Sequence, residues 1–152
     1  MKIISVANRK GGVGKTTTTI NIATALSAIG RNVLVIDFDP QGNATTSMGI
    51  AKQKENYSSY DVLIGNCDVK EAVLHTDLPR FDMIPSSPDL AAAEIELVEV
   101  DKREFVLKKA LNSLEAVYDY VLIDCPPSLN LITINALVSS NSVMVPLQCE
   151  FL

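Results

Sequence analysis

The sequence predicts an α/β fold in which a mainly parallel β-sheet is flanked by helices. Short apolar runs rich in Ile and Val recur without strict alternation, as in strands that are buried on both faces. Segments with helical spacing of apolar residues separate these runs, an alternation that is typical of α/β proteins. With 152 residues, 47% of them hydrophobic and 20% charged, the chain has the size and composition of one compact domain.

Five strands are expected, each a run of apolar residues bounded by polar turns. They cover Lys2–Ala7, Asn32–Phe38, Arg80–Ile84, Tyr120–Cys125 and Ser142–Leu147.

Helices are expected between these strands. The first covers Thr16–Ile29, and Gly30 supplies its stop signal. Asp68 with Glu71 and Asp101 with Glu104 resemble capping boxes, which predicts helices near 69–75 and 102–117. Two more are expected over Pro88–Val98 and Leu129–Ser139. Gln41–Tyr60, rich in Gly, Asn, Ser and Thr, is predicted to be a mobile surface segment.

Charge, cysteine content and hydropathy exclude several classes of protein. Thirteen Lys and Arg against eighteen Asp and Glu give a net charge of -5, so any DNA contact needs a local basic patch. Three cysteines without a CxxC pair argue against a disulfide framework and a zinc site. No apolar run approaches the roughly 18 residues of a membrane span. The apolar run at the start of the chain, which Arg9 and Lys10 end, is too short for the core of a signal peptide. We therefore expect a cytoplasmic protein.

A glycine-rich turn between the first strand and the first helix predicts a phosphate-binding loop. Its successive N–H groups and the following helix N-terminus would bind an anion. Lys15 would reach the β- and γ-phosphates of a nucleotide, and the Thr16 hydroxyl would bind Mg²⁺. The strict GxxxxGK(S/T) pattern requires glycine where the chain has Arg9, so this is a deviant form of the motif. The predicted cofactor-binding residues are Lys10, Gly11, Gly12, Val13, Gly14, Lys15, Thr16 and Thr17.

Two carboxylates follow predicted strands at the sheet edge where α/β proteins bind ligands. Asp124 ends an apolar strand, as does the carboxylate that holds Mg²⁺ through a water in phosphate-loop nucleotidases. Asp39 is expected to position the attacking water or accept its proton. Asp37 should point to the other face of its strand and support the site indirectly. The predicted switch regions, which would respond to the γ-phosphate, are Asp39, Pro40, Gln41, Cys125, Pro126 and Pro127.

Taken together, these segments resemble the ParA family of partition ATPases. That family lies in the deviant Walker A group of phosphate-loop NTPases, which also contains MinD and the nitrogenase iron protein. The resemblance is to Soj-like members and spans the whole chain. It rests on KGGVGKTT at 10–17, DFDPQGNAT at 37–45, IPSSPDLAAAEIEL at 84–97, YVLIDCPPSL at 120–129 and VPLQCEFL at 145–152.

The resemblance implies a Mg²⁺-dependent ATPase that segregates chromosomes or plasmids. It implies that Lys10 crosses an ATP-sandwiched homodimer to the partner's phosphates, that Gly12 lies at the dimer contact, and that Asp39 is needed for hydrolysis. The catalytic set is thus Lys10, Lys15 and Asp39. The implied partners are a ParB-type centromere-binding protein and non-specific DNA, with a nucleoid-associated location and no membrane binding. Family members run to about 250 residues, so residues 1–152 are expected to be the N-terminal portion of a single ATPase domain, without most of the DNA-contacting surface.

Three other interpretations remain open on the sequence. A MinD-like, membrane-cycling regulator of cell division shares Lys10, Lys15 and Asp39 but is less similar around DPQGNAT and DCPPSL. An iron–sulfur electron donor would need paired cluster cysteines, which Cys67 and Cys125 do not form. In the third, the chain folds and presents a surface without turning over nucleotide.

Overall fold

A computed structural model gives the fold and describes residues 1–8, 14–50 and 56–147. The strands are β1 (Lys2–Val6), β2 (Val33–Asp37), β3 (Leu74–His75), β4 (Phe81–Ile84), β5 (Tyr120–Asp124) and β6 (Ser142–Met144). The α-helices are α1 (Lys15–Ala28), α2 (Asn43–Ser47), α3 (Ser59–Ile64), α4 (Leu90–Glu96), α5 (Val106–Leu111) and α6 (Leu131–Ser139). Short 3₁₀ helices cover Val69–Ala72, Arg103–Phe105 and Asn112–Leu114.

The described strands form one six-stranded sheet in the order β3-β4-β2-β5-β1-β6. All neighbours pair in parallel except β3, which runs antiparallel to β4. The predicted α/β fold with a mainly parallel sheet is therefore confirmed. In register, Asp124 at the end of β5 pairs with Val6 of β1 on one side and with Asp37 of β2 on the other. This places the carboxyl ends of the three central strands side by side at one edge of the sheet.

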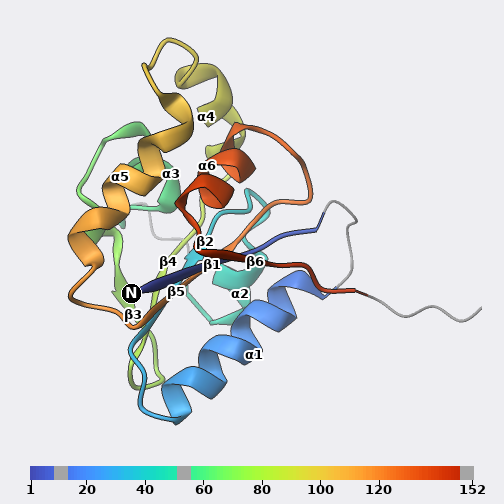
Figure 1. The fold of residues 1–152 in the computed structure, drawn as a ribbon, viewed down its shortest axis with the longest axis vertical. Coiled ribbons are helices and arrows are strands. Elements are labelled where there is room, and N and C mark those ends of the chain that lie inside the picture. The colour runs from blue at the N-terminus through green and yellow to red at the C-terminus, as the bar shows by residue number, and fades with distance from the viewer. Residues whose placement is uncertain (9–13, 51–55, 148–152) are drawn as a thin grey trace, which may run out of the picture.

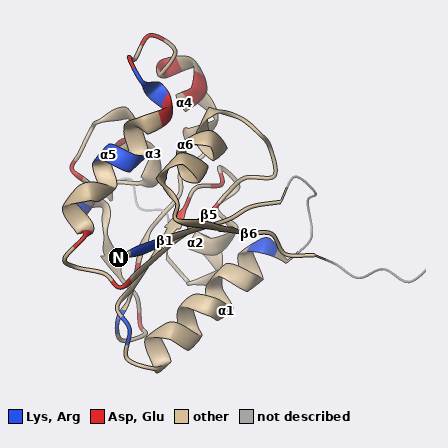
Figure 2. Cartoon of the chain, in the orientation of Figure 1, with Lys and Arg blue, Asp and Glu red and all other residues tan. Residues whose placement is uncertain are grey.

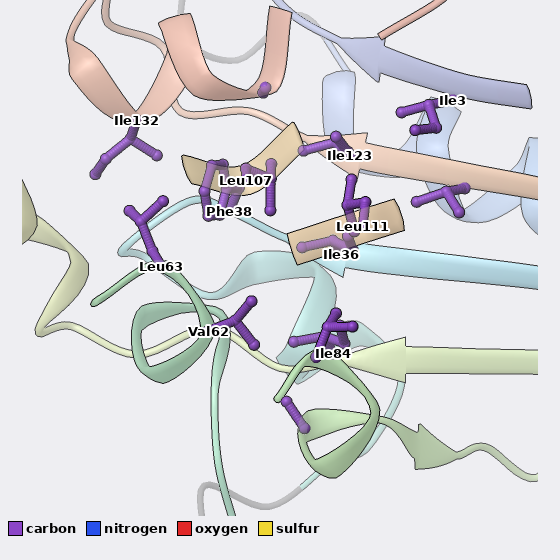
Figure 3. Close-up of a cluster of buried hydrophobic side chains, with 14 of the residues drawn as sticks. Ile3, Ile36, Phe38, Val62, Leu63, Ile84, Leu107, Leu111, Ile123 and Ile132 are labelled. Carbon is purple, nitrogen blue, oxygen red and sulfur yellow. The ribbon is translucent and has the colours of Figure 1, made fainter. Parts of the chain in front are cut away.

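Helices cover both faces of the sheet, as Figure 1 shows with α1 on one side and α5 and α6 on the other. Because side chains alternate along a strand, Leu34 and Ile36 pack under α3, α5 and α6, whereas Val33 and Val35 face α1. Figure 3 shows part of the first cluster, with Ile36 of β2 among side chains from β4, β5 and the covering helices. Two apolar faces explain why the strands read as continuous apolar runs in the sequence.

The five predicted strands are present, though their ends are shorter than the apolar runs suggested. The two-residue strand β3 was not predicted. It lies where the end of a helix was expected near 69–75, and that helix is a 3₁₀ turn over Val69–Ala72. Asp68 does cap this turn, because its carboxylate accepts a hydrogen bond from the Lys70 N–H.

The prediction of one continuous helix over 102–117 was wrong. A short 3₁₀ helix, α5 and a second 3₁₀ helix occupy this stretch in succession. Lys102 precedes the first of them in the left-handed conformation, with φ 53°, so the chain turns there and Asp101 does not act as the helix cap. The break lets the N–H of Leu107 donate to Asn135 Oδ1 of α6, at 3.1 Å.

The expectation of a mobile surface segment over Gln41–Tyr60 missed two helices, since α2 lies within this segment and α3 begins near its end. Helix α2 begins directly after Gly42, which has φ 68°, and its Ala44 and Thr45 are fully buried. Helix α3 begins after Ser58, whose N–H and hydroxyl both donate to Asp61. Polar composition concealed these helices because tertiary burial and a cap, not apolar periodicity, stabilise them.

Candidate functional site

The candidate site lies where β1, β5 and β2 end and α1 begins. Gly14 precedes α1 with φ 75°, a left-handed conformation that favours glycine, and its carbonyl accepts the N–H of Thr18 at 2.8 Å. Gly14 has no side chain that could cap this helix start. Figure 2 shows α1 uncharged except for a basic residue at its beginning, which the sequence identifies as Lys15. The N–H groups of the first helical turn and this lysine together favour an anion at the helix N-terminus.

Half of the predicted phosphate loop can be located. Gly14, Lys15, Thr16 and Thr17 form the start of α1 and the residue before it. Lys10, Gly11, Gly12 and Val13 lie outside the described residues.

The Lys15 side chain lies between two buried carboxylates. Its Nζ lies 3.2 Å from Asp124 Oδ1 and 3.7 Å from Asp39 Oδ2. The Lys15 side chain is only 10% exposed. Asp124 Oδ1 is buried and has no hydrogen bond, so the ion pair with Lys15 is its only polar contact in the described part of the chain.

Asp124 is completely buried and pairs through its other oxygen with Thr16, whose Oγ1 donates to Asp124 Oδ2 at 2.8 Å. Burial raises the pKa of Asp124 above its ordinary value, while Lys15 and Thr16 oppose that rise. The structure therefore brings the predicted Mg²⁺-binding hydroxyl and carboxylate into direct contact from segments 108 residues apart.

Asp39 lies at the exit of β2 and is 4% exposed. Its Oδ1 accepts the N–H of Gln41 at 3.0 Å, closing a tight turn around Pro40, and its Oδ2 faces Lys15. The carboxylate is thus held by its own turn and directed into the site.

Asp37 lies on the same face of β2 as Val33 and Val35, which is the face toward α1, so the expectation that it points to the other face was wrong. Among the described residues its carboxylate bonds to Thr45 and Asp39. Its Oδ2 accepts the N–H of Thr45 at 2.8 Å and the Thr45 hydroxyl at 2.6 Å, and its Oδ1 accepts the Asp39 N–H at 3.2 Å. Burial raises the pKa of Asp37 to about 6 despite these donors, and the nearby Asp124 adds to the rise. Thr45 and its neighbour Ser86 had no predicted role. Their only sequence signal is a position within the DFDPQGNAT and IPSSP segments.

The second predicted switch segment follows β5 directly. Cys125 is fully buried, its N–H donates to the Val6 carbonyl at 3.1 Å, and burial raises the pKa of its thiol to about 12. Pro126 is buried and Pro127 is exposed, so the turn passes from the core to the surface within two residues. The segment then reaches Asn130, which caps α6 by accepting the N–H of Thr133.

These residues fit a nucleotide phosphate with Mg²⁺. Lys15 is a largely covered cation at the helix N-terminus that could also pair with a phosphate group. Asp124 Oδ1 is a buried acceptor without a hydrogen bond among the described residues. Mg²⁺ in such sites needs one or two protein oxygens plus phosphates and waters. Over residues 1–8, 14–50 and 56–147, no group of three or more His, Cys, Asp or Glu could hold a metal ion.

Comparison with known proteins gives consistent matches along the whole chain. A family model described as an AAA domain matches residues 1–152. The chromosome partitioning protein ParA of Caulobacter vibrioides is 50% identical over 153 residues, which cover 99% of this chain and 57% of that protein. The sporulation initiation inhibitor protein Soj of Bacillus subtilis is 51% identical over 150 residues, which cover 99% of this chain and 59% of that protein.

A similar solved structure is that of cobyrinic acid a,c-diamide synthase from Mycobacterium smegmatis with bound ATP analogue and magnesium. It matches with a TM-score of 0.95 and 44% identity, over 99% of this chain and 62% of that one. The chain thus spans less than two thirds of the length of the relatives it matches.

Proposed function

The chain belongs to the family whose model is described as an AAA domain, and it is similar over its whole length to ParA and Soj proteins; from this premise we propose that the whole protein is a Mg²⁺-dependent ATPase of the ParA family that acts in chromosome or plasmid partitioning. The observation that carries the proposal is the contact of Lys15 and Thr16 with Asp124, with Asp39 on the other side of the lysine. A cation, a hydroxyl and two carboxylates at one helix N-terminus are the groups that phosphoryl transfer requires.

ATP is the proposed nucleotide, because the similar synthase structure holds an ATP analogue with magnesium. Lys15 would bind the β- and γ-phosphates, which would draw its ammonium group away from the two carboxylates that it contacts in this structure. Thr16 and Asp124, which contact each other here, are the residues that would hold Mg²⁺, the carboxylate through a water. The metal ion neutralises charge on the phosphate oxygens when it is bound.

Asp39 acts in the hydrolysis step. Its Oδ1 is occupied by the Gln41 N–H, whereas its Oδ2 contacts only the Lys15 side chain among the described residues. When Lys15 moves to the phosphates, Oδ2 can orient a water or accept its proton. Pro40 and Gln41 on one side, with Cys125, Pro126 and Pro127 on the other, form the segments that respond to the γ-phosphate.

The assembly and partners follow from the family. ATP binding produces a homodimer in which Lys10 contacts the partner's phosphates and Gly12 lies at the contact. The dimer binds non-specific DNA and a ParB-type protein and associates with the nucleoid in the cytoplasm. The partitioning proteins among the relatives support this function over a MinD-like cell-division regulator. None of the helices that the structure describes is long and apolar enough to cross a membrane.

Equilibrium titration with a fluorescent ATP analogue and Mg²⁺ tests the proposal. Lys15→Ala should lose nucleotide binding because it removes the positive charge on the phosphates. Lys109→Ala, which removes an exposed lysine of α5, is the matched control and should bind normally. Equal affinity of the Lys15→Ala variant and the unmodified protein would refute the phosphate site.

The dimer is tested separately by light scattering with and without ATP. Lys10→Ala should lower ATP-dependent dimerisation and ATP turnover, because both need a lysine from the second copy. Binding of Mg²⁺ and nucleotide through Lys15 and Thr16 should remain. Normal turnover by Lys10→Ala would refute a role for this lysine across the dimer.

A further inference from the structure

Ser86 is a buried polar residue at the candidate site that the nucleotide chemistry above does not use. It follows β4, in the turn that leads to α4, and is 5% exposed. Its hydroxyl donates to the backbone carbonyl of Asp39, and its own N–H donates to Thr45 Oγ1 at 3.0 Å. One residue outside the phosphate loop thus contacts both the turn that carries Asp39 and the helix behind it.

Thr45 connects this contact to β2. It is fully buried, and its hydroxyl accepts the Ser86 N–H while donating to Asp37 Oδ2 at 2.6 Å. Its backbone N–H donates to the same carboxylate oxygen at 2.8 Å. The hydroxyl therefore uses both its donor and an acceptor position, which fixes its rotamer.

Asp39 is consequently held at both polar groups of its backbone. Its N–H donates to Asp37 Oδ1 at 3.2 Å, and its carbonyl accepts the Ser86 hydroxyl and the Gly42 N–H, the latter at 2.9 Å. Asp39 lies beyond the last residue of β2, so these bonds hold it where the sheet no longer does. They come from segments up to 47 residues away in the sequence.

We propose that Ser86 and Thr45 are positioning residues that hold Asp39 with its carboxylate toward Lys15. The inference rests on the proposed role of Asp39 in hydrolysis. A displacement of about 1 Å in the group that orients the reacting water is enough to lower the rate of hydrolysis by a large factor. Neither Ser86 nor Thr45 is among the residues proposed to hold the nucleotide, so their loss should lower turnover and leave nucleotide affinity intact.

The first test measures the position of Asp39 without any nucleotide. Hydrogen–deuterium exchange is followed on residues 38–42 of this chain, where the N–H groups of Asp39, Gln41 and Gly42 are protected by the bonds described. Ser86→Ala should speed this exchange by about five- to tenfold, the effect of one lost hydrogen bond. Ser27→Ala, an equally buried serine hydroxyl near the end of α1, should leave residues 38–42 unchanged. Unchanged exchange in Ser86→Ala would overturn the proposal.

The second test measures turnover in the whole protein. Ser86→Ala and Thr45→Val should each lower kcat about five- to tenfold with the affinity for ADP unchanged. Thr45→Ser, which keeps the hydroxyl, should restore most of the loss, and it remains informative if Thr45→Val does not fold. Loss of stability without loss of kcat, or an equal loss in Ser27→Ala, would mean that the hydroxyls serve the fold alone and would overturn the proposal. If Asp39→Ala itself turned over normally, the role of Asp39 would fail while the exchange result still stood.

Discussion

Replacing Lys15 with methionine should destabilise the nucleotide-free protein, because the change leaves two buried carboxylates without their cation. At an effective dielectric constant of about 20, unit charges at 3.2 and 3.7 Å attract by about 5 and about 4.5 kcal/mol. Desolvation of the lysine offsets part of this attraction. Removing one partner of a buried ion pair costs about 3–5 kcal/mol, so we expect the free energy of unfolding to fall by about that amount.

Thermal unfolding at pH 8 and pH 5 measures the effect. For a chain of this size the loss at pH 8 corresponds to a melting temperature lower by about 10 °C. The difference in melting temperature between Lys15→Met and the unmodified protein should be smaller at pH 5. Without Lys15, the pKa of Asp124 rises further, and a group with a raised folded-state pKa stabilises the fold at low pH and loses that contribution as pH rises.

Lys109→Met is the matched control, because it removes an exposed lysine from α5 and should change the free energy of unfolding by no more than about 0.5 kcal/mol. The reasoning would be refuted if Lys15→Met had the same melting temperature as the unmodified chain at pH 8. It would also be refuted if the difference in melting temperature were larger at pH 5 than at pH 8.

Three further outcomes are expected. Asp39→Ala should retain ATP binding but lose hydrolysis, since it removes the water-orienting oxygen and no phosphate contact; a binding defect as large as that of Lys15→Ala would place Asp39 in the phosphate site instead. Asp37 has its pKa raised from 3.8 to about 6, so its contribution to stability is full below pH 3.8 and is lost as pH rises through 6, a change of up to about 3 kcal/mol. Urea unfolding of the chain and of Asp37→Asn between pH 4 and 7 should show that difference, and a pH-independent difference would contradict it. Finally, residues 1–152 alone should give no mobility shift with DNA at low salt, because a net charge of -5 cannot replace counterions along the phosphate backbone; salt-sensitive binding would locate the DNA surface in this part of the protein.

The sequence by itself determined five of the six described strands and the consecutive residues of the candidate site. Parallel strands buried on both faces are apolar along most of their length, so contiguous apolar runs such as Tyr120–Asp124 can be recognised as strands in the sequence. Likewise Gly14, Lys15 and Thr16 are consecutive, and their geometry follows from one strand-to-helix turn. Both features are local, and local periodicity and motif spacing are what a sequence displays directly.

Only the tertiary structure decided what surrounds these groups. The contact of Thr16 with Asp124 depends on β5 lying beside β1, and that of Ser86 with Asp39 depends on β4 lying beside β2. Helix α2 forms within a polar segment because packing buries its Ala44 and Thr45. Hydrogen bonds between segments 41 to 108 residues apart leave no periodic trace in either segment, since each partner is chosen by sheet order and burial and not by its neighbours in the chain.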